Sequence, residues 1–165
     1  MAGFHTKTFQ VHDDYMTPKY AWENIQQYIP KDKVIWEAFF GNGESGSDLS
    51  DMGFDVIHKD IDFFENDEGD IIVSNPPFSE AKKIMPRLRE LDKPFILIMP
   101  SSKINTGYIR ENFKDTEDHL QIIIPRKNIA KMPTTFLKPT MGEQAVRRTY
   151  EEPIPFILQV DKTNV

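Results

Sequence analysis

The stretch that decides the fold reads VIWEAFFGNGESG and occupies residues 34–46. It opens with mainly apolar residues, which predict a short buried strand, and continues into a G-x-G-x-x-G pattern at Gly41, Gly43 and Gly46. Glycine permits backbone angles that other residues avoid, and it lets a bound nucleotide approach the main chain closely. The stretch therefore predicts a strand that runs into a nucleotide-binding turn. The alternative is an exposed turn that needs glycine only for its geometry.

Strands and helices alternate on both sides of this stretch. An amphipathic helix is expected from Pro18 to about Tyr28, with Thr17 as its N-cap. Further strands are expected at 55–60, 70–74, 94–99, 121–124 and 156–160, and further helices at 47–52, 79–91 and 106–114. The strand at 94–99 is apolar on both faces, which is typical of a parallel sheet covered by helices. The predicted fold is a single Rossmann-like α/β layer with a mostly parallel sheet, an antiparallel final strand and helices on both faces.

Length and composition limit the class of protein. The chain has 165 residues, with 20 Lys and Arg against 26 Asp and Glu, which gives a formal net charge of −6. One domain spanning 1–165 is expected at this length, without a separate target-recognition domain. The sequence contains no Cys, no metal-ligand pattern and no apolar run long enough to cross a membrane. We therefore expect a soluble cytoplasmic protein with no disulfide, no metal and no membrane partner.

Acidic residues follow the glycine turn at a spacing suited to a ribose. Asp60 and Asp62 come about 20 residues after the turn, at the end of the next predicted strand, where a carboxylate can bind ribose hydroxyls. The glycine pattern alone fits a dinucleotide as well as S-adenosylmethionine. Glu37 and Phe39 favour S-adenosylmethionine, because a carboxylate at the strand end attracts a cationic amino-acid moiety and suits a pyrophosphate poorly.

A second unusual turn, Ser74-Asn75-Pro76-Pro77-Phe78, follows another predicted strand. Two consecutive prolines fix the backbone and remove two N–H donors, so the polar groups left near the turn are acceptors. Acceptors beside the flat face of Phe78 suit a planar amine such as N6 of adenine, and transfer of a sulfonium methyl group to it depends mainly on positioning. Asn75, Pro76, Pro77 and Phe78 are therefore the candidate catalytic residues. The alternative is a rigid strand-ending turn with a core Phe.

The two turns together resemble a known family. Trp36 to Gly43 is similar to the cofactor motif of class I S-adenosylmethionine-dependent methyltransferases, and Asn75 to Phe78 is similar to the motif with which their amino-methylating branch holds the target amine. In particular, the sequence resembles small DNA N6-adenine methyltransferase-like proteins of phages and viruses, which implies an adenine-specific enzyme in the host cell of a phage or virus. Tyr15-Met16-Thr17-Pro18 resembles the cofactor-contacting segment that precedes the glycine motif in many of them.

The resemblance also implies how the cofactor would be held. The residues that would contact S-adenosylmethionine are Tyr15, Thr17, Pro18, Glu37, Phe39, Gly41, Gly43, Asp60, Asp62, Phe63 and Asn75. Within this set, Glu37 and Phe39 would line the methionine part with the glycines, Asp60 would bind the ribose, and Asp62 and Phe63 would flank the adenine. The connection to the next strand is too short for a full helix and an edge strand, so the two acids lie close together and either can bind the ribose.

Charge is unevenly distributed along the chain. Residues 1–81 hold 5 basic and 16 acidic side chains, whereas residues 82–150 hold 14 basic and 7 acidic ones. Basic residues with an interleaved aromatic, Phe136, gather in the predicted loop 126–148, which is typical of a phosphate-binding surface. An ordinary solvated loop is the alternative. The candidate nucleic-acid-binding residues are Arg126, Lys127, Lys131, Lys138, Arg147 and Arg148.

The predicted function is methyl transfer from S-adenosylmethionine to N6 of adenine in nucleic acid, with DNA as the first expectation and RNA as the second. One alternative keeps the chemistry and changes the acceptor to a glutamine of a protein. Another is a non-catalytic cofactor-binding subunit of a methyltransferase complex, in which a protein partner supplies specificity. A nicotinamide-dependent oxidoreductase fits the glycine pattern and leaves the Asn-Pro-Pro-Phe turn unexplained.

Overall fold

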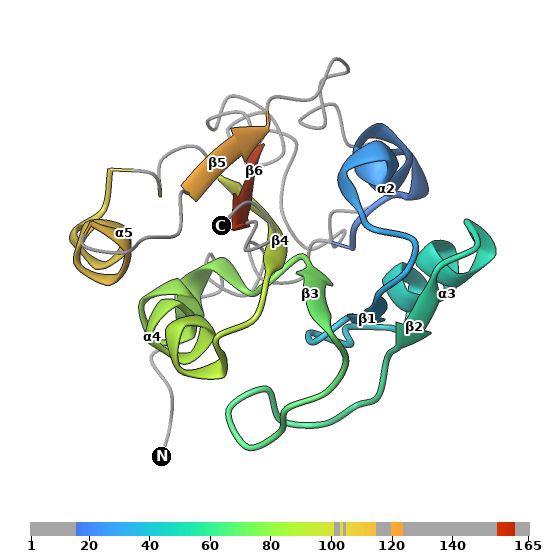
Figure 1. The fold of residues 1–165 in the computed structure, drawn as a ribbon, viewed down its shortest axis with the longest axis horizontal. Helices are drawn as coiled ribbons and strands as arrows, with labels where there is room; N and C mark the ends of the chain where they lie inside the picture. The colour runs from blue at the N-terminus through green and yellow to red at the C-terminus, as the bar shows by residue number, and fades with distance from the viewer. Residues whose placement is uncertain (1–15, 101–102, 104, 115–119, 124–154, 161–165) are drawn as a thin grey trace, which may run out of the picture.

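The computed structural model describes residues 16–100, 103, 105–114 and 120–123, together with the backbone of residues 155–160. Within this part of the chain, six strands form one sheet in the order β2-β1-β3-β4-β6-β5 (Figure 1). The strands are β1 Val34–Trp36, β2 Asp55–Ile57, β3 Ile71–Ser74, β4 Phe95–Pro100, β5 Leu120–Ile123 and β6 Pro155–Val160. The helices are α2 Lys19–Ile25, α3 Glu44–Asp51, α4 Ala81–Leu91 and α5 Gly107–Phe113, with 3-10 helices η1 Gln26–Tyr28 and η2 Phe78–Glu80. None of the described helices has the length and apolar character needed to span a membrane.

The sheet is parallel across its first four strands. β1 pairs with β2 on one side and β3 on the other, so that Ile35 lies opposite both Val56 and Ile71. β3 also pairs with β4 in parallel, whereas β6 runs antiparallel between β4 and β5. The predicted α/β fold, with its mostly parallel sheet and antiparallel final strand, is confirmed. Because the chain leaves β1 for β2 and then crosses to β3 on the opposite side, the carboxyl ends of β1 and β3 flank a topological switch point.

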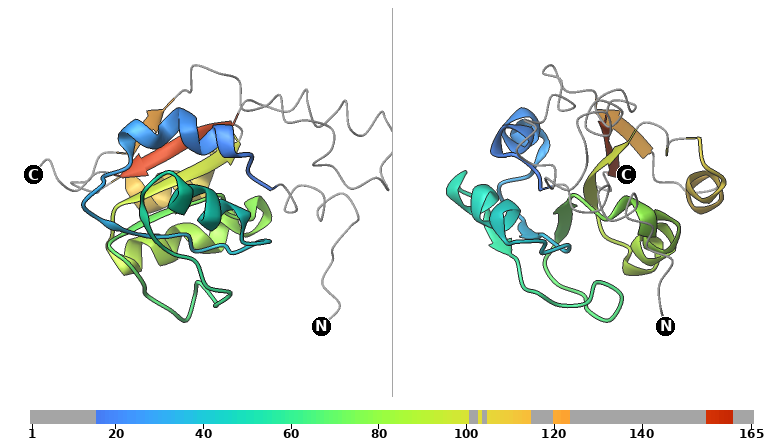
Figure 2. Two further views of the ribbon diagram at one scale, coloured as in Figure 1. Left: turned by 90° about the vertical axis from the view of Figure 1, so that its right-hand side faces the viewer. Right: turned by 180° about the vertical axis from the view of Figure 1, so that it is seen from behind.

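Helices cover both faces of the sheet, as predicted, with α2 and α3 on one side and α4 and α5 on the other (Figures 1 and 2). One buried cluster joins α2 and α3 to the sheet through Ala21, Trp22, Ile25, Leu49, Ile35, Val73 and Ile96. The opposite cluster joins α4 and α5 to the sheet through Ile84, Met85, Leu88, Ile109, Trp36, Ile72 and Phe95. Neighbouring strand residues such as Ile35 and Trp36 enter opposite clusters because side chains alternate across a strand. Because helices cover both faces, both alternating sets of side chains are buried, which explains why the central strands are apolar on both faces.

The helices start one to three residues away from the predicted positions, and α2 and α4 show why. α2 begins at Lys19 with Pro18 as its N-cap and with no side-chain cap, so the predicted capping role of Thr17 is wrong. α4 begins at Ala81 rather than at 79, because residues 78–80 form the 3-10 helix η2. Pro86 lies inside α4 on its exposed face, and the helix still extends to Leu91.

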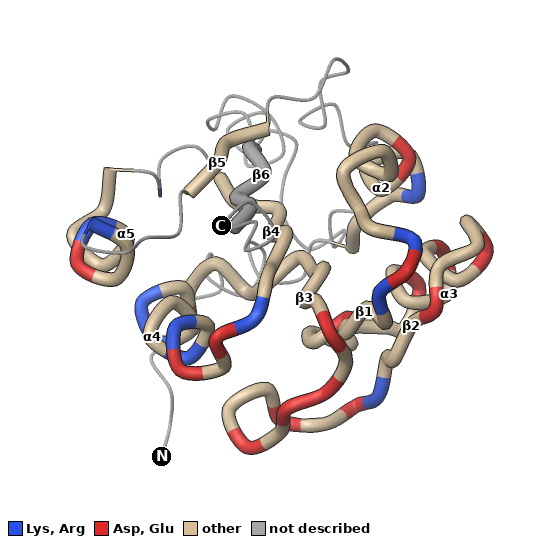
Figure 3. The backbone as a smooth tube through the Cα atoms, in the orientation of Figure 1, with Lys and Arg blue, Asp and Glu red and all other residues tan. Residues whose placement is uncertain are grey.

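Residues 58–70 connect β2 to β3 as one long loop, which contains neither a helix nor a strand although all its residues are described. Two long basic side chains hold the loop, one from α4 and one from the segment between α4 and β4. Arg87 Nη2 donates a hydrogen bond to the carbonyl of Asn66 at 2.9 Å, and Lys93 Nζ donates to the carbonyls of Glu68 at 2.8 Å and Gly69 at 2.7 Å. Figure 3 shows acidic residues along the loop and basic residues on α4. The loop thus takes a defined path without forming secondary structure.

Candidate active site

A cleft of about 470 Å³ lies beyond the carboxyl ends of β1 and β3. Four segments build its walls: the residues before α2, the turn after β1, the loop after β2 and the turn after β3. The lining residues are Met16, Thr17, Ala38, Phe39, Phe40, Gly41, Asn42, Ser45, Asp60, Ile61, Asp62, Phe63, Phe64, Asn75, Pro77 and Glu80. The cleft therefore lies at the topological switch point, where open α/β sheets bind their ligands.

The glycine turn has the backbone conformation that its sequence predicts. Gly41 and Gly43 have φ angles of 58° and 84°, in the left-handed region that favours glycine. The Gly43 amide donates a hydrogen bond to the Phe40 carbonyl at 2.8 Å, and a Cβ at Gly43 would lie 3.1 Å from the Phe40 ring. Asn42 Oδ1 accepts the Glu44 amide at 3.0 Å, which satisfies a free N–H at the start of α3. This bond accounts for a helix start three residues earlier than predicted.

Glu37 lies behind the cleft rather than on its surface. Only 1% of the residue is exposed, and one carboxylate oxygen accepts a hydrogen bond from the Ser74 hydroxyl. The other oxygen, Oε2, is buried with no hydrogen-bond partner among the described residues. Burial raises the pKa of Glu37 to about 7, against the lowering effect of the bonds from Ser74 and from the Phe39 amide. Near neutral pH the carboxyl group is therefore divided between its neutral and charged forms.

The turn after β3 places part of the predicted catalytic motif in the cleft. Asn75 and Pro77 line the cleft, and Asn75 Nδ2 donates a hydrogen bond to Thr17 Oγ1 at 2.9 Å. Pro76 is buried behind them, and Phe78 packs against the cluster under α4 instead of lining the cleft. The acceptor-rich turn thus meets the cleft, whereas the flat aromatic face expected beside it does not.

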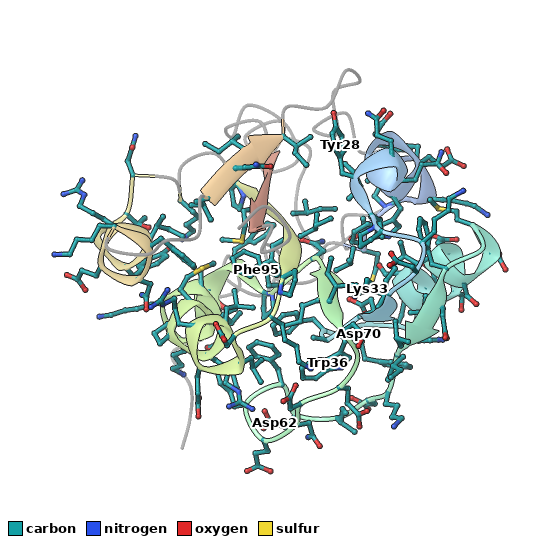
Figure 4. All side chains as sticks on the ribbon, viewed as in Figure 1. Tyr28, Lys33, Trp36, Asp62, Asp70 and Phe95 are labelled. Carbon is teal, nitrogen blue, oxygen red and sulfur yellow. The ribbon has the colours of Figure 1, made fainter. Side chains whose placement is uncertain are left out.

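Asp60 and Asp62 line the cleft together, at exposed positions on the loop after β2. Asp62 Oδ1 accepts a hydrogen bond from the Phe64 amide at 2.7 Å, so this carboxylate also shapes the loop. Figure 4 shows Asp62 at the outer edge of the molecule, with Trp36 in the interior. Asp60 has no such structural bond among the described contacts, which leaves its carboxylate available to a ligand.

Two neighbouring aromatic residues on this loop have opposite surroundings. Phe63 is only 3% exposed, and its ring lies 5.5 Å from that of Trp36 and 4.8 Å from that of Phe39, measured between centroids. Phe64 is 41% exposed and lines the cleft, with its ring edge-on to Phe63. The sequence pattern pointed to Phe63 and not to Phe64, and no signal in the sequence distinguishes the two neighbouring rings.

The predicted cofactor residues divide into those that reach the cleft and those that do not. The cleft is lined by Thr17, Phe39, Gly41, Asp60, Asp62, Phe63 and Asn75, while Pro18, Glu37 and Gly43 lie outside its lining. Tyr15 and the six predicted nucleic-acid-binding residues in 126–148 lie outside the described residues, so their roles stay predictions. Besides Phe64, the lining residues that were not among the predicted site residues are Met16, Ala38, Phe40, Asn42, Ser45, Ile61 and Glu80.

Comparison with known families and with curated proteins found no match to this chain. Within the described residues, no group of acidic and histidine side chains is arranged to hold a metal ion.

Proposed function

We propose that the protein is an S-adenosylmethionine-dependent methyltransferase that transfers a methyl group to N6 of adenine in nucleic acid. The observation that carries the proposal is the meeting of two turns in one cleft. The glycine turn after β1 contributes Gly41 and Asn42, and the turn after β3 contributes Asn75 and Pro77. The first suits a cofactor and the second an amine, so the cleft can bring donor and acceptor together.

The charge of the cleft supports S-adenosylmethionine over a dinucleotide. Among the described residues that line it, Asp60, Asp62 and Glu80 are acidic and none is basic. A pyrophosphate would meet these carboxylates without a compensating cation, whereas a sulfonium and an ammonium group would be attracted to them. The volume of about 470 Å³ lies within the usual range for small-molecule sites. We assign the ribose hydroxyls to Asp60, because the Asp62 carboxylate already accepts the Phe64 amide.

The fold supports the same proposal. The order β2-β1-β3-β4, the antiparallel β6 beside β4 and the helices on both faces agree with a Rossmann-like class I methyltransferase architecture. In such a layer the cofactor lies at the switch point beside β1, and here the glycine turn follows that strand.

The chemistry asked of the protein is mainly positioning. S-adenosylmethionine supplies an electrophilic methyl group on a positively charged sulfur. The turn at Asn75 offers oxygen acceptors to the hydrogens of the amine, which keeps the nitrogen lone pair available for in-line attack on the methyl carbon. The C–S bond breaks as the C–N bond forms, and the amine releases one proton to solvent. A duplex base would have to be flipped out to reach this turn.

One observation favours a second candidate, a non-catalytic cofactor-binding subunit. Phe78 packs against the core under α4 and does not offer its ring to the cleft. An amine held at Asn75 would therefore lack the aromatic plate that the sequence predicts beside it. A protein glutamine remains a further acceptor for the same turn, and the basic segment 126–148 favours nucleic acid over it.

The decisive experiment is transfer of tritiated methyl groups from S-adenosylmethionine to pools of DNA, RNA and protein. We expect label in adenine of nucleic acid, lowered at least about 100-fold by Asn75→Ala. Asn112→Ala is the matched control, because Asn112 bonds the Tyr108 carbonyl within α5 and lies outside the cleft lining. Equal labelling by Asn75→Ala would refute the role of the turn. Cofactor binding without transfer would favour the subunit, and binding of NAD but not of S-adenosylmethionine would overturn the proposal.

A further inference from the structure

Thr17 and Asn75 are joined although 58 residues separate them in the sequence. Asn75 Nδ2 donates to Thr17 Oγ1 at 2.9 Å, and Thr17 is only 4% exposed. Both residues line the cleft. A hydrogen bond shielded from water in this way holds its partners more firmly than an exposed one, because water does not compete for the same groups.

Thr17 belongs to a short segment that reaches both functional turns. Its neighbour Met16 lies beside the glycine turn, since a Cβ built on Gly41 would lie 3.6 Å from Met16 Sδ. Pro18 restricts the preceding residue to extended backbone, in which consecutive side chains point in opposite directions. Met16 and Thr17 can therefore contact two different turns, Met16 at Gly41 and Thr17 at Asn75.

The bond has a direct consequence for the side chain of Asn75. An amide side chain carries donors on its nitrogen and an acceptor on its oxygen, and rotation about its last bond exchanges the two. Donation from Nδ2 to Thr17 selects one of these orientations and places the amide oxygen on the opposite side of the group. That oxygen is shielded from solvent in the structure. An amine substrate that gains access to it needs it as an acceptor in this orientation, so the orientation matters for transfer.

We propose that Thr17 is a positioning residue that orients the Asn75 amide for the methyl acceptor, and that segment 16–18 ties the acceptor turn to the glycine turn. This inference rests on the proposed function and deepens it. It differs from the role that the resemblance implies, in which Thr17 contacts the cofactor. A cofactor contact would govern cofactor affinity, whereas a positioning residue governs the rate of transfer at saturating cofactor.

Two variants separate these roles. Thr17→Val keeps the shape of the side chain and removes the hydroxyl, and Thr17→Ser keeps the hydroxyl. We expect Thr17→Val to lower kcat about tenfold while the cofactor Kd stays within about twofold of wild type. Thr17→Ser should keep kcat near the wild-type value. Thermal unfolding of each variant shows that the fold is intact. An unchanged kcat in Thr17→Val, or a raised cofactor Kd with kcat intact, would overturn the inference.

A second measurement does not depend on activity. The side-chain amide resonances of Asn75, assigned by their loss in Asn75→Ala, report the environment of Nδ2 directly. We expect them to shift in Thr17→Val and to stay near the wild-type position in Thr17→Ser. Unshifted resonances in Thr17→Val would overturn the positioning role. Shifted resonances in a protein that methylates nothing would uphold the contact and refute the proposed function instead.

Discussion

Ser74 donates a hydrogen bond from its hydroxyl group to the carboxylate of Glu37, and this bond joins the carboxyl ends of β3 and β1. Both residues are shielded from solvent, with Ser74 at 0% and Glu37 at 1% exposure. The Glu37 amide also bonds the Ile57 carbonyl at 3.0 Å, so the same residue reaches β2 through its backbone. A single buried acid thus connects the three strands that carry the cleft.

This buried acid predicts how stability depends on pH. Glu37 holds its proton up to about pH 7 in the folded protein but only to about 4.5 when unfolded, so the unfolded chain binds fewer protons between these values. The free energy of unfolding should therefore fall by about 3 kcal/mol as pH rises through this window. Glu37→Gln removes this titration. In urea unfolding, the free energy of unfolding of the variant should therefore rise relative to that of wild type as pH increases from about 4.5 to about 7. If the free energies of unfolding of the two proteins depend on pH in the same way, the raised pKa of Glu37 is contradicted.

Phe64 should contribute to ligand binding and Phe63 to stability. Phe64→Ala removes an exposed ring from the cleft wall, and we expect roughly tenfold weaker binding of S-adenosylmethionine by calorimetry, with little change in unfolding. Phe63→Ala should instead cost about 3 kcal/mol of stability, because its ring is packed in the core. Tyr28→Ala is the control, since Tyr28 is 42% exposed outside the cleft lining. If Phe64→Ala and Tyr28→Ala bind S-adenosylmethionine with equal affinity, Phe64 does not contribute to the binding site.

The fold could be predicted from local patterns because the spacing of apolar residues within a segment distinguishes a strand from a helix. The apolar stretch before Gly41 and the helical spacing of Ala81, Ile84 and Leu88 both correspond to buried faces in the structure. Both turns at the cleft could also be predicted locally, because glycine and proline determine the backbone conformation of their own segment. The sequence therefore predicted the two turns at the ends of their strands, whereas the strand order that brings them together at the switch point is seen only in the structure.

The orientation of individual side chains could not be predicted in this way. Phe63 turns inward and Phe64 outward because the loop path is fixed by Arg87, which bonds backbone carbonyls of the loop from α4. Thr17 bonds Asn75 rather than the start of α2, and that partner lies 58 residues away. Such contacts depend on tertiary structure, which a motif of a few residues does not contain.

Gly46 is required by a neighbouring histidine. A Cβ at this position would overlap the ring of His58, which stacks on Phe40 with 6.0 Å between centroids. Gly46→Ala should therefore cost about 1–3 kcal/mol of stability in denaturant unfolding. Combining it with His58→Ala should recover only part of that loss, because the Cβ of residue 58 would still lie 2.5 Å from the new Cβ. Gly107→Ala is the control, because a Cβ there meets nothing within 4 Å and should leave stability unchanged or slightly higher. A Gly46→Ala variant as stable as the Gly107→Ala variant would show that the helix can shift freely.

Lys93 should stabilise the loop that carries Asp60 and Asp62. Its ammonium group bonds the carbonyls of Glu68 and Gly69 and pairs with Asp67, while only 18% of the side chain is exposed.

Lys93→Met should cost about 2 kcal/mol and raise amide hydrogen exchange across the loop, because it leaves two carbonyls without their charged donor. Lys59→Met removes the 3.3 Å ion pair with Glu68 from a side chain that is 59% exposed, so its cost should stay below about 1 kcal/mol. If the loop exchanges equally fast in both variants, the buried bonds of Lys93 do not control its path. If only Lys93→Met also weakens S-adenosylmethionine binding, the position of the loop is what brings its carboxylates to the cofactor.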